Sequence, residues 1–406
     1  MCFVTVPHPL GMISKEEVNA KVDAAFDDIV KAATAWTPSK EKQDAQVKPY
    51  PAKRFKFSGT YADVNDMFQK RKWSLSLPIV PPTVDKVAAM LKSTKRNPAE
   101  VLWVVPPRQG MLTVELVAAL GVMAGAKPEH MPLLIATVEA MADPVAAWRG
   151  PTTTTAATVP VFFISGPIIE KLKLNPGTGT AGGENPVTNA LGYFVNLVGD
   201  VVGGSVPPNF DKSTHGSSAD LVAMVFTENA KENPWKTTYA EEAGFKPGDS
   251  IVTHFSAYLG NANIDHDSKT GQRLLTTLST GLLGSASGLA SCLADYDATY
   301  AINNKVSFAF IVLCPEHAAT IAKDFPDQRA ARDFMRETAA MPYKFYSQET
   351  CVPGKDFGPY DENTFIPRFK KTESIKFFVS GGPGKQSQIW VPFPQVFKPV
   401  SKKIAE

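Results

Sequence analysis

Short apolar runs that stop at proline- or glycine-rich turns constrain the fold of this chain more than any other feature. Residues 101–105, 159–164 and 306–313 are such runs, and each is followed by a turn and a polar loop or a helix. Their length and residue types are typical of buried strands, and strand, loop and helix in succession are typical of a mixed α/β protein. The dispersed prolines argue against a helical bundle, because proline in a helix interior removes a hydrogen bond. We therefore predict an α/β fold with central sheets flanked by helices.

The length of the chain predicts more than one domain. It has 406 residues, and a single hydrophobic core stops growing at about 250–300 residues. We predict three parts: an N-terminal helix with an extended arm over residues 1–60, a first α/β domain over 61–205 and a second over 206–406.

The N-terminal part has its own signature. Ser14 followed by Glu17 is a capping box, and apolar residues then repeat at helical spacing, which predicts a helix over 14–36. Residues 37–60 are polar and rich in lysine and proline, so they form either an arm around a partner subunit or a solvated surface segment. The arm and the apolar helices favour a homo-oligomer.

Charge and cysteine usage exclude several classes of protein. The formal charge is only +2, so we expect neither nucleic acid nor membrane as a partner. No signal peptide is recognisable, and no apolar run reaches the length of about 18 residues that a spanning helix needs. Cys2, Cys292, Cys314 and Cys351 form neither a disulfide framework nor a zinc pattern. These features predict a reducing, cytoplasmic location.

Two polar loops after strands carry an arginine, and α/β sheets bind ligands in such loops. Arg108 lies in residues 106–110, and Arg149 precedes four threonines at 152–155. An arginine can hold a carboxylate or phosphate, and hydroxyls can add donors, whereas a surface arginine and a threonine-rich edge strand are the alternatives. We predict that Arg108, Arg149 and Thr153 bind a small anionic substrate.

Two glycine-rich loops could also face the substrate. In residues 175–186 and 381–385, glycines let backbone N–H groups point at an anion, although neither loop matches a nucleotide-binding pattern. We add Asn189, Gly382 and Lys385 to the predicted substrate-binding residues.

A histidine between two aspartates is the main candidate for acid–base chemistry. Asp265 or Asp267 could fix the tautomer of His266, which suits a general base or a metal ligand. We predict that His266, Asp265 and His215 are catalytic and that His215, His266 and Asp267 could hold a divalent metal ion. The alternative is that these histidines only hydrogen-bond to loop backbone. The prediction requires Arg108, Arg149, His215 and His266 to surround one cavity.

A cysteine lies where a strand meets a helix, in Cys314-Pro315-Glu316-His317. A thiol at a helix start has a lowered pKa, and His317 could act as its base. Neighbours at a helix start do not face one another, however, so a buried cysteine at a strand end is the alternative.

Five stretches resemble a largely uncharacterised family of about this length that is associated with small proteins bearing a selenocysteine-Gly-Ser-Cys or Cys-Gly-Ser-Cys motif. They are residues 77–83 (Leu-Pro-Ile-Val-Pro-Pro-Thr), 105–108 (Val-Pro-Pro-Arg), 123–129 (Met-Ala-Gly-Ala-Lys-Pro-Glu), 313–319 (Leu-Cys-Pro-Glu-His-Ala-Ala) and 381–385 (Gly-Gly-Pro-Gly-Lys). The resemblance implies redox or sulfur chemistry with a thiol- or selenol-bearing partner. This chain has no Cys-Gly-Ser-Cys, so such a thiol would come from another polypeptide, or this member has lost it.

Three functions follow from these patterns. The first is an enzyme of the lyase, hydratase or isomerase type that acts on a small anionic metabolite by acid–base or metal-assisted chemistry. The second is a thiol-dependent oxidoreductase or sulfur-chemistry component that works with a small thiol protein. The third is a non-catalytic subunit that binds a ligand.

Overall fold

A computed structural model of the chain describes residues 4, 6, 13–35, 51–206, 214–258, 260–285, 308–346, 361–393 and 396–405. The chain forms two compact units, Met1–Lys48 and Pro49–Glu406. Cys2, Cys292 and Cys351, and residues 36–50 of the predicted arm, lie outside the described residues.

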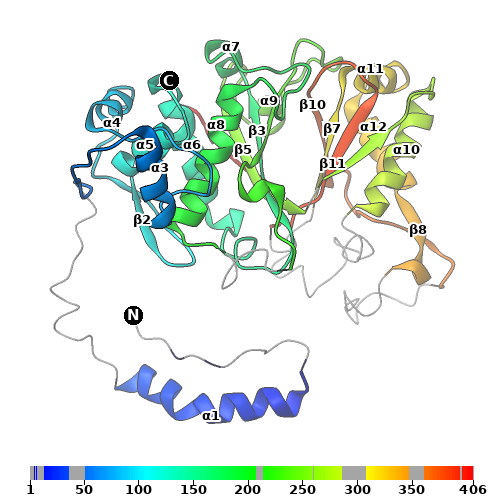
Figure 1. The fold of residues 1–406 in the computed structure, drawn as a ribbon. Coiled ribbons are helices and arrows are strands. Elements are labelled where there is room, and N and C mark those ends of the chain that lie inside the picture. The colour runs from blue at the N-terminus through cyan, green and yellow to red at the C-terminus, as the bar shows by residue number, and fades with distance from the viewer. Residues whose placement is uncertain are drawn as a thin grey trace. The chain divides into compact units, whose positions relative to one another are not determined.

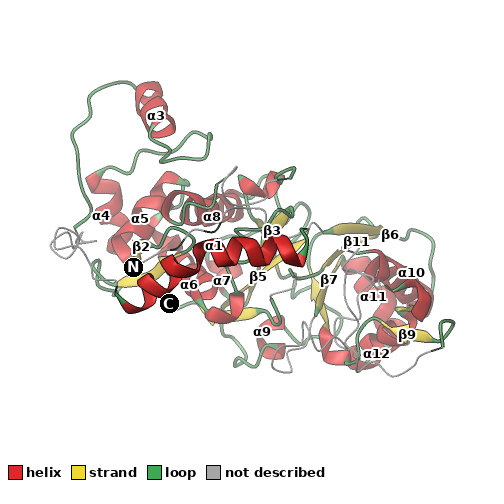
Figure 2. Ribbon diagram, turned by 90° about the horizontal axis from the view of Figure 1, so that it is seen from below, coloured by secondary structure: helices red, strands yellow, loops and turns green. Residues whose placement is uncertain are grey.

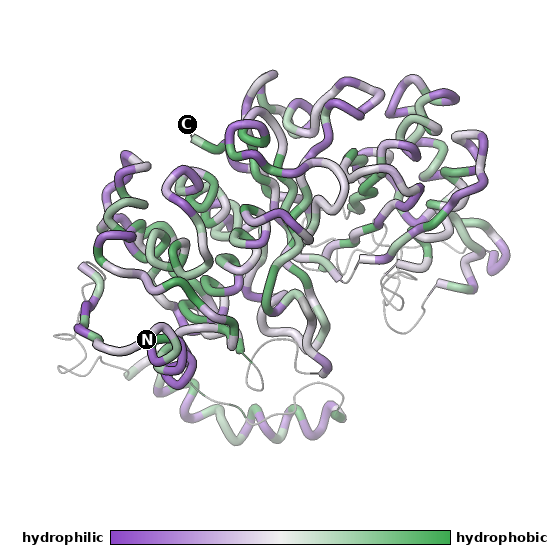
Figure 3. The backbone as a smooth tube through the Cα atoms, turned by 45° about the horizontal axis from the view of Figure 1, so that its top comes forward, coloured by the Kyte–Doolittle hydropathy of each residue, from purple (hydrophilic) through white to green (hydrophobic). Residues whose placement is uncertain are grey.

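The first unit contains the helix α1 (Lys15–Thr34), which confirms the helix predicted from the capping box. The backbone N–H of Glu17 donates to Ser14 Oγ at 3.2 Å, and the backbone N–H of Ser14 donates to the Glu17 carboxylate at 2.8 Å. Polar and apolar segments alternate along this helix (Figure 3). Its apolar side chains Phe26 and Val30 are exposed.

The second unit begins with a helical layer and a small hairpin. The helices are α3 (Tyr61–Lys70), α4 (Val84–Leu91), α5 (Val114–Met123), α6 (Met131–Ala142) and, later in the chain, α8 (Pro186–Asn196). The strands β1 (Val101–Val105) and β2 (Gly110–Thr113) pair antiparallel. Helices α5 and α6 are apolar around most of their circumference because they are buried on nearly all sides.

The first large sheet has the strand order β12-β5-β3-β4. Its strands are β12 (Val400–Lys403), β5 (Ile251–Tyr258), β3 (Thr158–Ser165) and β4 (Met224–Thr227). Only β3 and β4 run parallel. Helices α5, α6 and α8 lie together beside this sheet (Figure 1) and share one hydrophobic core with it.

The second large sheet has the strand order β10-β7-β11-β6. Its strands are β10 (Ile375–Val379), β7 (Ala309–Leu313), β11 (Gln386–Trp390) and β6 (Asn261–Ile264). Only β7 and β10 run parallel. Helices α10 (Gly271–Gly284), α11 (Pro315–Asp324) and α12 (Gln328–Thr338) gather beside β7 and β11 (Figure 2) and form a core with that sheet. The shorter elements are α7 (Ile168–Lys171), α9 (Tyr239–Glu242), β8 (Ala340–Pro342) and β9 (Phe365–Pro367).

An aromatic core joins the two sheets. Phe163 of β3 stacks on Phe310 of β7 with ring centroids 4.4 Å apart, and both rings are fully buried. At the end of β4, Glu228 forms a β-bridge with Ser380, which follows β10. The carboxyl ends of both parallel strand pairs therefore meet in one region.

The architecture confirms the predicted α/β class, because helices flank mixed sheets with parallel and antiparallel strands. The runs at 101–105, 159–164 and 306–313 correspond to β1, β3 and β7, although residues 306–307 lie outside the described part. Strand β3 precedes residue 205, whereas its partners β4 and β5 follow it, so one sheet spans the predicted boundary at 205/206. None of the helices in the described residues combines the length and apolar composition that a bilayer span requires.

Candidate functional site

A cavity of about 310 Å³ opens where β7 and β10 end. Residues 179–183 of the first glycine loop form one side, and residues 380–382 form another. Phe226, Val312, Cys314, Gln386 and Gln388 complete the lining. The cavity thus lies at the carboxyl ends of a parallel strand pair, where α/β sheets bind ligands.

The two glycine loops hold each other in place. The backbone N–H of Gly381 donates to the carbonyl of Pro176 at 2.9 Å. A Cβ at Gly382 would lie 2.1 Å from Thr178 Oγ1 and 2.9 Å from the Thr178 backbone, so only glycine allows this approach. The Asn189 side chain, predicted to bind substrate, instead donates to the Gly183 carbonyl at 3.1 Å and supports the loop.

Cys314 contributes a thiol to the lining of this cavity. It directly follows β7 and is the N-cap residue of α11. Burial raises the pKa of its thiol, while the N–H groups of His317 and Gln386 and the hydroxyl of Ser387 act in the opposite direction. The thiol is therefore protonated at neutral pH, with three donors placed to stabilise a thiolate once it forms.

The Ser387 hydroxyl, which acts on the Cys314 thiol, is itself hydrogen-bonded to an imidazole. Ser387 Oγ lies 2.8 Å from Nδ1 of His317, and Nε2 of His317 lies 3.1 Å from the backbone carbonyl of Asp265. A carbonyl only accepts, so Nε2 carries the ring proton and Nδ1 is free to accept from Ser387. His317 and Ser387 are both buried, with exposed fractions of 2% and 1%.

The imidazole of His317 is neutral, which is the protonation state that a general base requires. Burial lowers the pKa of His317 below its ordinary value, and the Asp265 carbonyl and nearby carboxylates offset only part of this effect. His317 is thus neutral at pH 7. A proton can pass from Cys314 to Ser387 while the Ser387 proton passes to His317 Nδ1.

The same cavity offers donors for a developing negative charge. In the part of the chain that the structure describes, the backbone N–H groups of Gly182, Gly183 and Gly382 have no hydrogen-bond acceptor. All three glycines line the cavity. Unpaired backbone N–H groups beside a nucleophile form the type of site that stabilises an oxyanion.

Asp265 and His266, the predicted acid–base pair, do not contact each other through their side chains in the way we expected. The Asp265 carboxylate accepts from the hydroxyls of Thr277 at 2.6 Å and Ser268 at 2.8 Å, so it does not orient the His266 ring. Partial burial would raise the pKa of Asp265, but these hydrogen bonds outweigh it and lower the pKa to about 2. His266 is exposed, and its carbonyl accepts from Lys385 Nζ at 2.8 Å.

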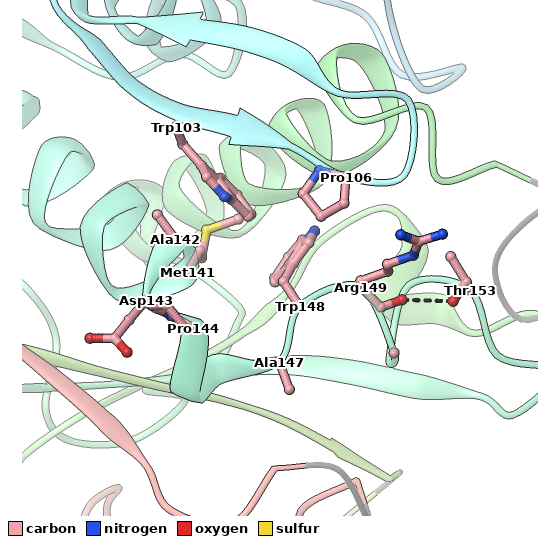
Figure 4. A pocket seen from close by; sticks show the side chains of 11 residues that line it. Trp103, Pro106, Met141, Ala142, Asp143, Pro144, Ala147, Trp148, Arg149 and Thr153 are labelled. Atoms are coloured by element: carbon pink, nitrogen blue, oxygen red, sulfur yellow. Dashed lines mark hydrogen bonds between the residues drawn. The ribbon is translucent and has the colours of Figure 1, made fainter. Parts of the chain in front are cut away.

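The predicted arginines lie at a second cavity. This cavity, of about 500 Å³, is lined by Arg149 and Thr153 (Figure 4). Arg108 follows Pro106 of its lining, and the Arg108 side chain packs over Gly204. His215 is exposed and follows Thr214, whose N–H reaches the Thr155 carbonyl at 3.4 Å.

Neither of these two cavities brings Arg108, Arg149, His215 and His266 together. The second cavity has no lining residue in common with the Cys314 cavity. Gly382, Lys385, Asp265 and His266 belong to the region of Cys314, whereas Arg108, Arg149, Thr153 and His215 belong to the region of the second cavity. Arg149 and Thr153 lie between α6 and β3 and not after a strand as predicted, whereas His266 follows β6.

The predicted metal site is not assembled either. Within the described ranges, no three histidine, cysteine, aspartate or glutamate side chains lie close enough to hold a metal ion. His215, His266 and Asp267 are among these residues, and His215 lies in a different loop from the other two.

Sequence reasoning missed Ser387 and the backbone role of Asp265. Ser387 lies in β11, which pairs antiparallel with β7 and so places the hydroxyl beside the residues that follow β7. No spacing rule links two residues that are 70 positions apart. The sequence does contain one local indication of this site, the Cys-Pro-Glu-His stretch, and a helix starts there in the structure.

Comparison of the chain with protein-family models, with curated proteins and with solved structures found no match.

Proposed function

We propose that this protein is a thiol-dependent enzyme in which Cys314 attacks the carbonyl carbon of a small, uncharged acyl compound. The observation that carries the proposal is the chain from Cys314 through Ser387 and His317 to the Asp265 carbonyl, placed at a cavity with unpaired backbone donors. A nucleophile, a base, a group that orients the base and an oxyanion site are the parts that acyl transfer requires.

The reaction would run in two balanced steps. The thiol proton moves through Ser387 to His317 Nδ1 as sulfur bonds to the carbonyl carbon, and the carbonyl oxygen becomes an oxyanion held by backbone N–H groups. When the carbon–leaving group bond breaks, the leaving group takes the proton back from His317. The thioester on Cys314 then passes its acyl group to water or to another nucleophile.

The cavity lining supports an uncharged substrate. Its side chains come from glycine, threonine, alanine, phenylalanine, valine, cysteine, serine and glutamine, so none carries a formal charge. A carboxylate or phosphate in this cavity would have no charged partner among these residues.

The acid–base enzyme predicted first has less support. The described residues give the His266 ring no hydrogen-bond partner, and the Asp265 carboxylate is occupied by Thr277 and Ser268. A thiol- or selenol-bearing partner, a homo-oligomer and a cytoplasmic location stay predictions. A partner thiol would enter this scheme as the acceptor of the acyl group.

Alkylation of the native protein by iodoacetamide tests the thiol, with the modified peptide identified by mass spectrometry. The neutral imidazole is already competent at pH 7, so we expect the Cys314 rate to be nearly flat between about pH 7 and 9. In His317→Asn the rate should instead rise about tenfold per pH unit towards the raised pKa of the thiol.

His130→Asn is the matched control, because His130 is also buried and its pKa is also lowered by burial. It should leave the profile flat. A wild-type rate that climbs with pH like a simple thiol, or no labelling of Cys314 in the folded protein, contradicts the proposal. The acyl step is tested with p-nitrophenyl acetate, which should release one nitrophenolate per chain in a burst and leave acetyl on Cys314.

A further inference from the structure

We propose that the second cavity binds an aromatic carboxylate, as a site separate from Cys314 and independent of the chemistry proposed there. The cavity holds about 500 Å³, which is within the range of small-molecule sites, about 300–1,000 Å³. Its lining comes from β1, from the end of α6 and from residues 143–153.

The segment that carries Arg149 is fixed by its own hydroxyls. Ala147 adopts a left-handed conformation with φ of 49°, which turns the chain after α6. Thr153 Oγ1 then donates to the Arg149 carbonyl at 2.7 Å, and Thr152 Oγ1 donates to the Trp148 carbonyl at 2.7 Å. These threonines therefore hold the loop instead of offering donors to an anion, which leaves that task to Arg149.

One end of the cavity is apolar. Trp103, Met141 and Trp148 lie together there, with Pro106 above Trp148 (Figure 4). The rings of Trp103 and Trp148 meet edge to face, with centroids 5.7 Å apart and an interplanar angle of 77°. Aromatic walls of this kind favour a planar apolar body over a compact polar one.

The other end carries an uncompensated positive charge. Arg149 is exposed and has no ion-pair or hydrogen-bond partner for its guanidinium in the described chain. Asp143, the acidic residue in the lining, is engaged by Lys402 Nζ at 2.8 Å and by the N–H of Val145 at 3.0 Å. A carboxylate is the group that a free guanidinium binds with two parallel hydrogen bonds.

A buried donor between the two ends is also unsatisfied. Trp148 is only 4% exposed, and its indole N–H has no acceptor. Figure 4 shows this nitrogen on the edge of the ring that faces Pro106, between the apolar end and Arg149. A buried donor without an acceptor is unfavourable, and an oxygen of a bound ligand would satisfy it.

Titration of the full chain with phenylacetate, followed by tryptophan fluorescence and calorimetry, tests the site. We expect saturable binding that Arg149→Gln weakens by about tenfold or more, because a charge-assisted pair is lost. Phenylacetamide, which has the same shape without the charge, should bind wild type weaker by a similar factor. Trp103→Leu should weaken the binding of phenylacetate although the positive charge of Arg149 stays in place.

Arg273→Gln is the matched control, because Arg273 is an exposed arginine on α10, and it should leave binding unchanged. Equal affinity of Arg149→Gln and wild type for phenylacetate overturns the proposal, as does the absence of saturable binding. Displacement of phenylacetate by inorganic phosphate at equal affinity also overturns it, since charge alone would then explain binding. The Arg149 side chain is exposed, so its replacement tests binding without unfolding the protein.

Discussion

The buried carboxyl of Glu228 should make the stability of the fold depend on pH. Glu228 is 3% exposed and accepts from the Tyr239 N–H at 2.7 Å and from the Ser165 hydroxyl. Burial raises the pKa of Glu228 from 4.5 to about 6, against the effect of these two hydrogen bonds. The perturbation is Glu228→Gln, which keeps the shape and removes the ionisation.

The size of the effect follows from the two pKa values. Because the pKa is higher in the folded state, that state binds the proton more tightly than the unfolded chain does, and stability is lost as pH rises from about 4.5 to about 6. The loss amounts to about 2 kcal/mol. Glu228→Gln avoids it, so the variant should gain about 2 kcal/mol relative to wild type between pH 4 and pH 7.

Urea unfolding of both proteins at a series of pH values measures this difference. Contributions from all other titrating groups cancel in the comparison, provided that the m-values agree. The exposed Glu184→Gln controls for the removal of one negative charge. A gap between Glu228→Gln and wild type that stays constant over this range, or that closes as pH rises, would refute the reasoning.

Two further variants test close packing, one at the Cys314 cavity and one in the aromatic core between the two sheets. Gly382→Ala forces a Cβ to within 2.9 Å of the Thr178 backbone and should lower the free energy of unfolding by about 1–3 kcal/mol. The control is Gly284→Ala, whose Cβ would meet nothing within 4 Å and which should cost little. Equal losses of stability in the two variants would contradict the argument. Phe163→Ala removes the ring stacked on Phe310 and should cost about 3–5 kcal/mol in chemical denaturation; a loss below about 1 kcal/mol would mean that the two sheets do not depend on this contact.

Local patterns in the sequence predicted the elements well because their causes are local. The capping box at Ser14 does start a helix, and the apolar run at 101–105 is a strand in the structure. The turn at Cys314-Pro315 does lead from a strand into a helix. Periodicity, caps and prolines act within a few residues, so a single sequence contains them.

The site was less predictable because it depends on strand pairing between distant segments. Ser387 reaches His317 only because β11 lies antiparallel to β7, with Gln388 opposite Val312. Strand β11 itself is short and polar, which hides it from an apolar pattern. The arginines were assigned correctly to loops, but nothing in the sequence says that Arg149 follows the helix α6 whereas His266 follows the strand β6 of the second sheet.

Because His317 contacts the backbone carbonyl of Asp265 and not its side chain, substitution at position 265 would not by itself reveal this contact. The proton-bearing nitrogen of the imidazole is set by a main-chain oxygen, which every amino acid possesses. Replacing the residue at 265 would disturb the turn that its carboxylate holds, yet any side chain that keeps the turn would leave the imidazole correctly oriented. The requirement falls on the path of the backbone beyond β6, where a one-residue insertion would be more damaging than any substitution.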